Sequence, residues 1–221
     1  MKTINIAIDG PSGAGKSSIS KAIAKELGFI HVDTGAMYRA IGLYALRNNC
    51  TEPEQIAEHL PKIEIELKFI GGVQRVLLCG EDVTDSIRSP EVSMAASKTS
   101  AVPAVRKHLL DLQKKIASEN NILMDGRDIG TVVLPHADLK IFLTASAEER
   151  ASRRYLELRE KPDCPPYEEI LRDIQQRDYN DMHRETAPLC QAEDAILVDS
   201  SDMGFHEVVK HITALIKEKL D

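Results

Sequence analysis

The chain has 221 residues, which suits one large domain with a sizeable apolar interior and excludes a multidomain machine. Hydrophobic residues account for 43% and charged residues for 29%, and no apolar run approaches the roughly 18 residues of a membrane span. The formal net charge of −7 argues against a surface that wraps nucleic acid. We therefore expect a soluble protein that binds neither a membrane nor nucleic acid.

The expected compartment follows from the amino terminus and the cysteines. Residues 1–8 pass directly into a strand-like run and form no apolar segment typical of a signal peptide. The cysteines lie far apart, at Cys50, Cys79, Cys164 and Cys190, so neither a zinc site nor a disulfide framework is indicated. We expect a cytoplasmic protein.

Short β-branched runs alternate with longer amphipathic stretches, a pattern typical of a parallel sheet covered by helices. The predicted strands are Ile4–Ile8, Phe29–Val32, Ile122–Met124, Leu139–Leu143 and Ala195–Val198. The predicted helices are Ser17–Leu27, Met37–Asn48, Val105–Ser118, Glu148–Glu160, Tyr167–Arg184 and Phe205–Leu220. The strands carry few polar residues, as expected for strands that are buried on both faces. The predicted fold class is therefore α/β, with a five-stranded parallel sheet and helices on both faces.

One region, between about residues 60 and 88, breaks this alternation. Residues 63–69 alternate between hydrophobic and polar with a period of two, the pair Gly71 and Gly72 follows, and residues 75–83 continue the pattern. This region is predicted to be a small antiparallel insert.

The strongest chemical signal lies between the first predicted strand and the first predicted helix. Residues 10–17 match the phosphate-binding loop, or P-loop, with its glycines, its lysine and its hydroxyl residue at fixed spacing. Backbone N–H groups and a helix amino terminus would converge there on one anion. The Lys16 ammonium would bridge the β- and γ-phosphates, and Ser17 would help to hold Mg²⁺. The residues predicted to bind ATP in this segment are Gly10, Pro11, Ser12, Gly13, Ala14, Gly15, Lys16, Ser17 and Ser18.

A magnesium ion usually takes one or two carboxylates and keeps several waters. Asp9 precedes the loop, and Asp33 and Asp125 follow apolar strands, so each is a candidate. Each could equally be a helix cap or a turn residue, and the sequence does not choose among them.

Arginines are concentrated near the carboxyl-terminal third of the chain. Seven of the thirteen arginines lie between residues 150 and 184, where an even distribution would place about two. Arginine is favoured where phosphate or carboxylate is gripped bidentately, which predicts an anion site. The alternative is a solvated helix whose arginines pair with neighbouring glutamates.

A phosphate acceptor needs further cations, because two polyanions must be held in line. Three clusters could supply them: residues 33–39, residues 125–128 and residues 177–181. Thr34 is expected to cap a helix that carries Tyr38 and Arg39 in its first turn. Arg177 and Asp181 share a helix face, where an ordinary salt bridge is the alternative interpretation.

Taken in order, the motifs resemble those of bacterial cytidylate kinases. The matching segments are residues 10–16 (GPSGAGK), 33–39 (DTGAMYR), 125–133 (DGRDIGTVV), 148–154 (EERASRR) and 177–181 (RDYND), so the resemblance spans nearly the whole chain. It implies the nucleoside-monophosphate-kinase fold and the ATP-dependent phosphorylation of CMP and dCMP. We also expect a monomer.

The resemblance implies a division of the chain into three parts. The core is expected at residues 1–33, 91–149 and 185–221, and the monophosphate-binding region with its antiparallel insert at about 34–90. A mobile helical lid is expected at about 150–166. Pro162 stands in this lid near a position where a glycine is expected, which affects the hinge but not the chemistry.

The resemblance also assigns roles by position. Arg39 and Arg127 match arginines that hold the acceptor phosphate, with Thr34 and Tyr38 beside them, while Ser97, Arg106 and Asp128 match positions that read cytosine. Arg177 and Asp181 match the ribose-binding pair. Arg154 and Arg184, with Arg150 and Arg153, match arginines that close on the transferring phosphate. The predicted catalytic residues are therefore Lys16, Arg154 and Arg184. Arg153 and Arg154 are also predicted to bind ATP. Asp128 could instead stabilise the turn beside Arg127.

Two other functions remain open at this stage. One is a kinase for a different small acceptor, such as UMP, AMP or a sugar acid. The other is a regulatory module that binds a nucleotide, hydrolyses ATP slowly and signals to a protein partner.

Overall fold

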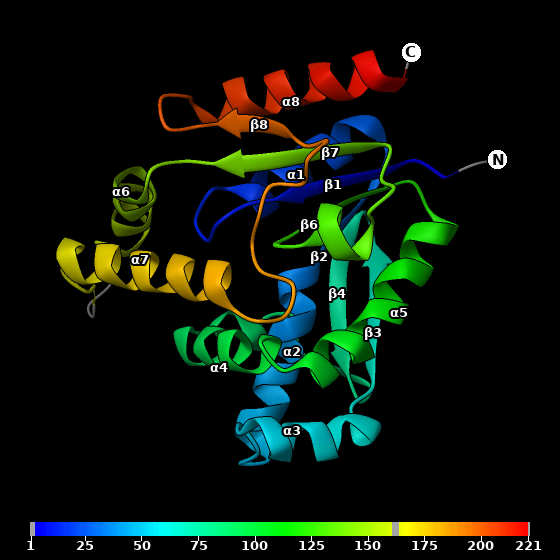
Figure 1. The fold of residues 1–221 in the computed structure, drawn as a ribbon, viewed down its shortest axis with the longest axis vertical. Helices are drawn as coiled ribbons and strands as arrows, with labels where there is room; N and C mark the ends of the chain where they lie inside the picture. The colour runs from blue at the N-terminus through cyan, green and yellow to red at the C-terminus, as the bar shows by residue number, and fades with distance from the viewer. Residues whose placement is uncertain (1–2, 161–163, 221) are drawn as a thin grey trace.

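A computed structural model describes residues 3–160 and 164–220 of the chain. Its centre is a sheet of five strands, all paired in parallel (Figure 1). The strands are β1 (Asn5–Asp9), β2 (Ile30–Asp33), β6 (Ile122–Gly126), β7 (Leu139–Thr144) and β8 (Ile196–Asp199). They lie in the order β2-β6-β1-β7-β8. The five predicted strands are confirmed, with ends shifted by one or two residues.

The described helices include all six that the sequence predicts. They are α1 (Lys16–Leu27), α2 (Thr34–Arg47), α3 (Pro53–His59), α4 (Pro90–Ser100), α5 (Pro103–Glu119), α6 (Ala147–Leu158), α7 (Tyr167–His183) and α8 (Phe205–Leu220). α3 and α4 were not predicted from the sequence, and α2 begins three residues before its predicted start at Met37. In the described part of the chain, no helix combines the length and the apolar character needed to cross a bilayer.

Helices cover both faces of the sheet because its strands carry apolar residues on both sides. Ile6 and Ile8 of β1 belong to an apolar cluster with α1 and α8, and Ala7 between them belongs to a second cluster with α5. This is the period of two that a strand imposes on its side chains. The predicted fold class is confirmed.

The predicted antiparallel insert is also confirmed. It consists of β3 (Ile65–Ile70), β4 (Val73–Leu78) and β5 (Glu81–Asp82) in that order. Gly71 and Gly72 both take the left-handed backbone conformation in the turn between β3 and β4. Gln74 attaches the insert to the end of β2, because its side-chain amide exchanges hydrogen bonds of 2.9 and 3.2 Å with the backbone of Asp33.

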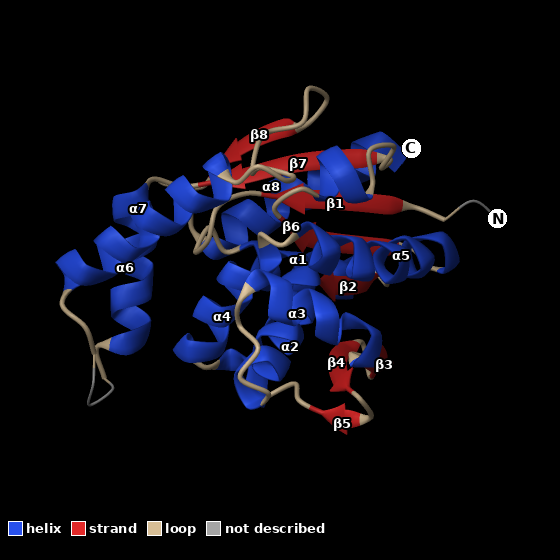
Figure 2. Cartoon of the chain, turned by 60° about the horizontal axis from the view of Figure 1, so that its bottom comes forward, coloured by secondary structure: helices blue, strands red, loops and turns tan. Residues whose placement is uncertain are grey.

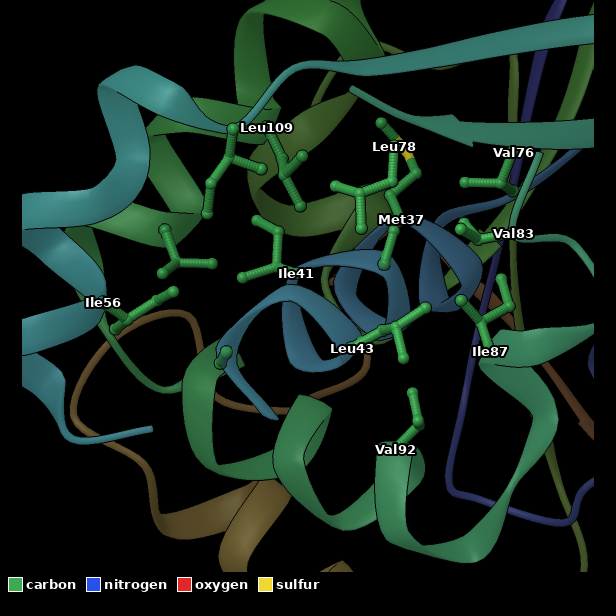
Figure 3. Close-up of a cluster of buried hydrophobic side chains, with 14 of the residues drawn as sticks. Met37, Ile41, Leu43, Ile56, Val76, Leu78, Val83, Ile87, Val92 and Leu109 are labelled. Atoms are coloured by element: carbon green, nitrogen blue, oxygen red, sulfur yellow. The ribbon is translucent and has the colours of Figure 1, made fainter. Parts of the chain in front are cut away.

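A third apolar cluster surrounds α2 and joins the insert to the helices (Figure 3). Met37 and Ile41 of α2 are fully buried in it. Val76 and Leu78 come from β4, and Val92 comes from α4. This packing fixes the position of α2, whose amino-terminal turn follows β2 directly.

α2 and α4 approach each other closely at Gly42. A Cβ atom at this position would lie 2.7 Å from the backbone nitrogen of Ala96 and 3.0 Å from the carbonyl oxygen of Val92. These are backbone atoms, which cannot move aside as a flexible side chain could. The absence of a side chain at Gly42 therefore sets the separation of the two helices.

α6 and α7 lie side by side at one side of the sheet in both views (Figures 1 and 2). α6 follows β7 after a short connection, in which Ser146 caps the helix by accepting a hydrogen bond from the Glu149 amide. The carboxyl ends of the strands thus face the loop after β1, the start of α2 and the helix pair α6 and α7. Ligands bind at this edge in open α/β sheets.

Candidate active site

A cleft of about 330 Å³ opens at this edge of the sheet. Most of the predicted site residues line it: Ser12, Gly13, Gly15, Lys16, Ser17, Ser18, Thr34, Tyr38, Arg39, Ser97, Arg106, Arg127, Asp128, Arg177, Asp181 and Arg184. The predicted residues that do not line it are Gly10, Pro11, Ala14, Arg150, Arg153 and Arg154. The residues predicted to bind ATP and those predicted to bind the acceptor therefore face a single cavity.

The P-loop takes a backbone path that requires its glycines. Gly13 and Gly15 have φ angles of 79° and 84°, in the left-handed region. Gly10 has a φ of 148°, and a Cβ there would lie 1.9 Å from the carbonyl oxygen of Leu143 in β7. The loop is therefore pressed against β7 at its start and turns into α1 at Gly15.

Lys16 is buried, and its ammonium folds back onto the loop. Its Nζ donates hydrogen bonds of 2.7 Å to the carbonyl oxygens of Gly10 and Pro11. Burial, together with the nearby Arg127 cation, lowers the pKa of Lys16 well below its ordinary value, against the opposing effect of Asp125 and other carboxylates. An anion in the loop would stabilise the charged ammonium.

Ser17 and Asp125 form the only hydrogen bond between the loop and the end of β6 among the described residues. The Ser17 hydroxyl donates to Oδ2 of Asp125 at 2.7 Å, and Nε2 of His31 lies 2.5 Å from Oδ1. Burial alone would raise the pKa of Asp125, but His31, Lys16 and Ser17 outweigh it and lower that pKa. The carboxylate is therefore held in its anionic form. The contact between His31, which belongs to β2, and Asp125 could not be predicted from the sequence.

The other two carboxylate candidates serve the fold. Asp9 accepts hydrogen bonds of 2.8 and 2.7 Å from the backbone amides of Ile129 and Gly130. Burial raises its pKa from 3.8 to about 6, although both hydrogen bonds act to lower it. Asp33 accepts from the Ala36 amide at 3.0 Å and from Arg39 at 2.9 Å.

These contacts correct the prediction that Thr34 caps α2. Asp33 is the N-cap, and Thr34 is the first residue of the helix. From that position the Thr34 hydroxyl donates to the backbone carbonyl of Asp125 at 2.8 Å and so joins α2 to β6. A carboxylate is as good an N-cap as a hydroxyl, and one residue of shift decides which of the two is used.

Four of the residues that line the cleft are arginines: Arg39, Arg127, Arg177 and Arg184. Arg127 donates from Nε to Asp181 at 2.8 Å. In contrast, Nε of Arg39, Nε of Arg177 and one terminal nitrogen of Arg184 are buried without a hydrogen-bond partner among residues 3–160 and 164–220. Burial, and the neighbouring arginines after it, lower the pKa of Arg177 and of Arg184. Buried donors of this kind are costly unless they are paired.

The alternative of a local salt bridge between Arg177 and Asp181 is not realised. Asp181 pairs with Arg127, which comes from the end of β6 and is 54 positions away in the sequence. The two residues do share a face of α7, as predicted, and both line the cleft.

Arg106 and Asp128 form the end of the cleft next to Tyr38. A terminal nitrogen of Arg106 donates to Oδ2 of Asp128, and both side chains are buried. Arg184 lies 3.6 Å from the other carboxylate oxygen. The Arg106 guanidinium also lies over the Tyr38 ring, 5.5 Å from its centroid. Ser97 lines the same wall from α4.

Arg153 and Arg154 lie on α6, outside the cleft. Arg153 donates to Glu149 at 2.9 Å and to the carbonyl oxygen of Ser200 at 2.7 Å. Arg154 is half exposed and pairs with Glu157 at 3.0 Å. These contacts match the alternative in which arginines pair with neighbouring glutamates, and the assignment of Arg153 and Arg154 to ATP stays a prediction. Pro162 lies outside the described residues.

Comparisons with known proteins agree with this arrangement. The family model for cytidylate kinase matches residues 6–218. The chain belongs to the cytidylate kinase family. A cytidylate kinase of Caldicellulosiruptor saccharolyticus is 57% identical over 97% of this chain and 96% of its own length. One from Desulfitobacterium hafniense is 51% identical over 100% of this chain and 95% of its own length.

A solved structure described as an uncharacterized protein from Eubacterium ventriosum shares the fold of this member of the cytidylate kinase family. Its TM-score is 0.50 at 12% identity, with 98% of this chain and 97% of that chain covered. At this identity the likeness concerns the fold alone.

Proposed function

We propose that this protein transfers the γ-phosphoryl group of ATP directly to CMP and dCMP, forming CDP and dCDP. Family membership makes it a nucleotide kinase. The observation that carries the proposal is a set of buried guanidinium nitrogens without a hydrogen bond, Nε of Arg39, Nε of Arg177 and one terminal nitrogen of Arg184, whose residues line one cleft with the P-loop. Of the three nitrogens, that of Arg184 has a carboxylate oxygen of Asp128 at 3.6 Å. An anionic acceptor in that cleft would satisfy them and would lie next to a donor phosphate.

The donor side consists of the P-loop and Lys16. A triphosphate in the loop would accept hydrogen bonds from the Lys16 ammonium, which here donates to the carbonyl oxygens of Gly10 and Pro11. Ser17 and Asp125 offer a hydroxyl and an anionic carboxylate at the same place, which is the oxygen donor set that Mg²⁺ prefers. When bound there, Mg²⁺ would neutralise charge on the phosphate oxygens.

The acceptor side has a cationic part and a part that reads the base. Arg39, Arg127, Arg177 and Arg184 would hold the monophosphate. Arg106 and Asp128 place a donor beside an acceptor, which matches the ring nitrogen and the exocyclic amine of cytosine. When the base enters, the hydrogen bond between Arg106 and Asp128 would break, or each of the two side chains would bind the base in addition.

The reaction would need no general base. The attacking oxygen belongs to a phosphate that is already ionised, so the residues of the cleft act by holding the two nucleotides in line and by neutralising charge. Lys16 and Arg184 both line the cleft and would both neutralise charge on the transferring group.

The division into core, monophosphate-binding region and lid accompanies this proposal. The described parts of the expected lid lie on α6 and in the approach to α7. Closure of α6 over the cleft would bring Arg154 to the phosphates and would exclude water, which limits wasteful hydrolysis of ATP. A monomeric state and a cytoplasmic location remain predictions from the sequence.

A coupled assay with CMP, dCMP, UMP and AMP as acceptors tests the function. We expect turnover with CMP and dCMP, and specificity constants at least about 100-fold lower for UMP, since the cost of unpaired buried polar groups is large. A higher specificity constant for UMP or AMP than for CMP would support the alternative of a kinase for a different acceptor. Turnover of ATP that does not depend on any acceptor would support the regulatory module instead.

A further inference from the structure

Arg150 is the most completely buried arginine of the chain segment that is rich in arginines, with 4% of its surface exposed. It lies in the first turns of α6 and makes hydrogen bonds to three separate elements. Its Nε donates to the carbonyl oxygen of Ala145 after β7 at 2.9 Å. One terminal nitrogen donates to the carbonyl oxygen of Ser12 in the P-loop at 2.9 Å. Both terminal nitrogens bind Asp178 of α7, at 3.1 and 2.6 Å.

These four hydrogen bonds use all but one of the five N–H groups of the guanidinium. Arg150 is absent from the lining of the cleft. Arg150, which the family resemblance placed among the arginines that close on the transferring phosphate, therefore makes its hydrogen bonds to protein atoms. Its planar fork fixes the geometry of its partners, which a lysine could not do.

The two ends of this contact belong to opposite sides of the reaction. Ser12 precedes Gly13, and a Cβ at Gly13 would lie 3.4 Å from Cβ of Arg150, so the arginine packs directly against the turn of the P-loop. Asp178 follows Arg177, whose unpaired Nε lies on the acceptor side. One turn further along α7, Asp181 holds Arg127. The path from the donor loop to the acceptor arginines thus runs through one ion pair, in which Arg150 is buried and Asp178 is partly buried.

We propose that Arg150 and Asp178 are positioning residues that couple the ATP site to the CMP site, so that occupation of the P-loop by ATP tightens the binding of CMP. The inference rests on the proposed function and adds a pair of residues to it. A triphosphate that orders the turn at Ser12 and Gly13 orders Arg150, and the bidentate contact with Asp178 then holds α7 with its acceptor side chains in place. Coupling between two sites commonly amounts to a factor of roughly 5 to 150 in affinity.

The test is a binding cycle on the full chain by calorimetry. The dissociation constant of CMP is measured alone and with a saturating non-hydrolysable β,γ-imido analogue of ATP, and the ratio of the two is the coupling factor. Asp178→Asn removes one of the two carboxylate acceptors, and Arg150→Lys removes the fork. Each variant should keep the affinity for CMP alone within about 2-fold and should lower the coupling factor by about 5-fold or more. The double variant should lose no more than the stronger single one.

Matched controls come from α7 itself, where Asp173 and Arg172 are exposed. Asp173→Asn and Arg172→Lys should leave the coupling factor unchanged. Asp178→Asn keeps the size of the side chain, so it serves as the decisive variant if Arg150→Lys does not fold.

Three results would overturn the inference. One is a coupling factor that stays at the parent value in both variants. Another is an equal loss of CMP affinity with and without the ATP analogue, which would mean a structural role only. The third is a parent protein that binds both nucleotides without coupling. A parent that binds the ATP analogue but no CMP would instead remove the proposed function, and the inference with it.

Discussion

Arg106 and Asp128 neutralise each other in a buried ion pair at the end of the cleft, although they are 22 positions apart in the sequence. The same carboxylate lies 3.6 Å from Arg184. Asp128 therefore stands between a residue expected to read the base and one expected to act on the phosphate. We therefore predict that the choice of acceptor depends on Asp128.

Asp128→Asn should lower the specificity constant for CMP and narrow the ratio between CMP and UMP. A carboxylate only accepts hydrogen bonds, so it can bind the amine of cytosine but repels the carbonyl of uracil. An amide can also donate a hydrogen bond. Two mismatched groups at about 1–3 kcal/mol each correspond to a discrimination on the order of 10² to 10⁴ in the parent. Steady-state kinetics with both monophosphates measure the effect, and Asp111→Asn, at an exposed position of α5, is the control. An unchanged ratio would favour the role of Asp128 as a turn-stabilising residue.

Lys16→Ala should lower kcat by about 10² or more, since the ammonium stabilises charge that develops in the transition state. The thermal unfolding of the variant should stay close to that of the parent, which a circular dichroism melt checks. Lys21→Ala removes an exposed lysine from the same helix and should change neither quantity. Turnover of Lys16→Ala within a few-fold of the parent would contradict the assignment of the loop.

Arg184→Ala and Arg154→Ala should both reduce kcat more than they reduce the affinity for CMP. The structure adds a distinction, because Arg184 already lines the cleft, whereas Arg154 does not and pairs with Glu157 at its border. The exposed pair contributes about 0–1 kcal/mol at most to the stability of the fold. Arg154→Ala with normal kinetics and a lower free energy of unfolding would assign that arginine to the surface salt bridge alone.

Asp9 should make the stability of the protein depend on pH between about 4 and 6. Its pKa is raised from 3.8 to about 6 in the folded state, so the folded protein binds this proton more tightly than the unfolded chain does. The contribution is fully present below pH 4 and is lost as the pH rises through 6. At about 1.4 kcal/mol per pKa unit, it amounts to about 3 kcal/mol.

Urea unfolding of the parent and of Asp9→Asn from pH 4 to pH 7 isolates this effect. The asparagine removes the titration but also one acceptor for the amides of Ile129 and Gly130, so it should be less stable at every pH. The difference in unfolding free energy between the two proteins should shrink as the pH rises. A difference that is constant over this range would contradict the raised pKa.

The parts of the fold that depend on local pattern could be predicted, while those that depend on tertiary packing could not. The strands, the P-loop and the antiparallel insert follow from hydrophobic period, glycines and turn residues. α4 was missed because residues 90–100 are rich in small and polar residues and form a helix whose packing is set by Gly42 of α2. Its apolar face is only apparent once α2 is in place.

The same limit applies to the site. The sequence identified most of the residues that line the cleft but not which of them pair. A salt bridge between Asp181 and the neighbouring Arg177 on α7 was the alternative interpretation, whereas Asp181 binds Arg127, which directly follows β6. His31 alternates with apolar residues in β2 and gives no sign in the sequence that its ring reaches Asp125. Such contacts join residues far apart in the chain, and spacing rules hold only within one helix or strand.

The close approach of α2 and α4 also bears on how acceptor preference can change during evolution. α2 carries Tyr38 and Arg39, and α4 carries Ser97, and all three residues line the cleft, so we expect the spacing of these two helices to set the room for the acceptor base. Since a single methyl group at position 42 would collide with the backbone of Ala96, we expect a descendant with alanine there to have α4 further from α2 and a wider cleft between them. A single substitution at Gly42, a residue that does not line the cleft, would thus be expected to make room for a bulkier base.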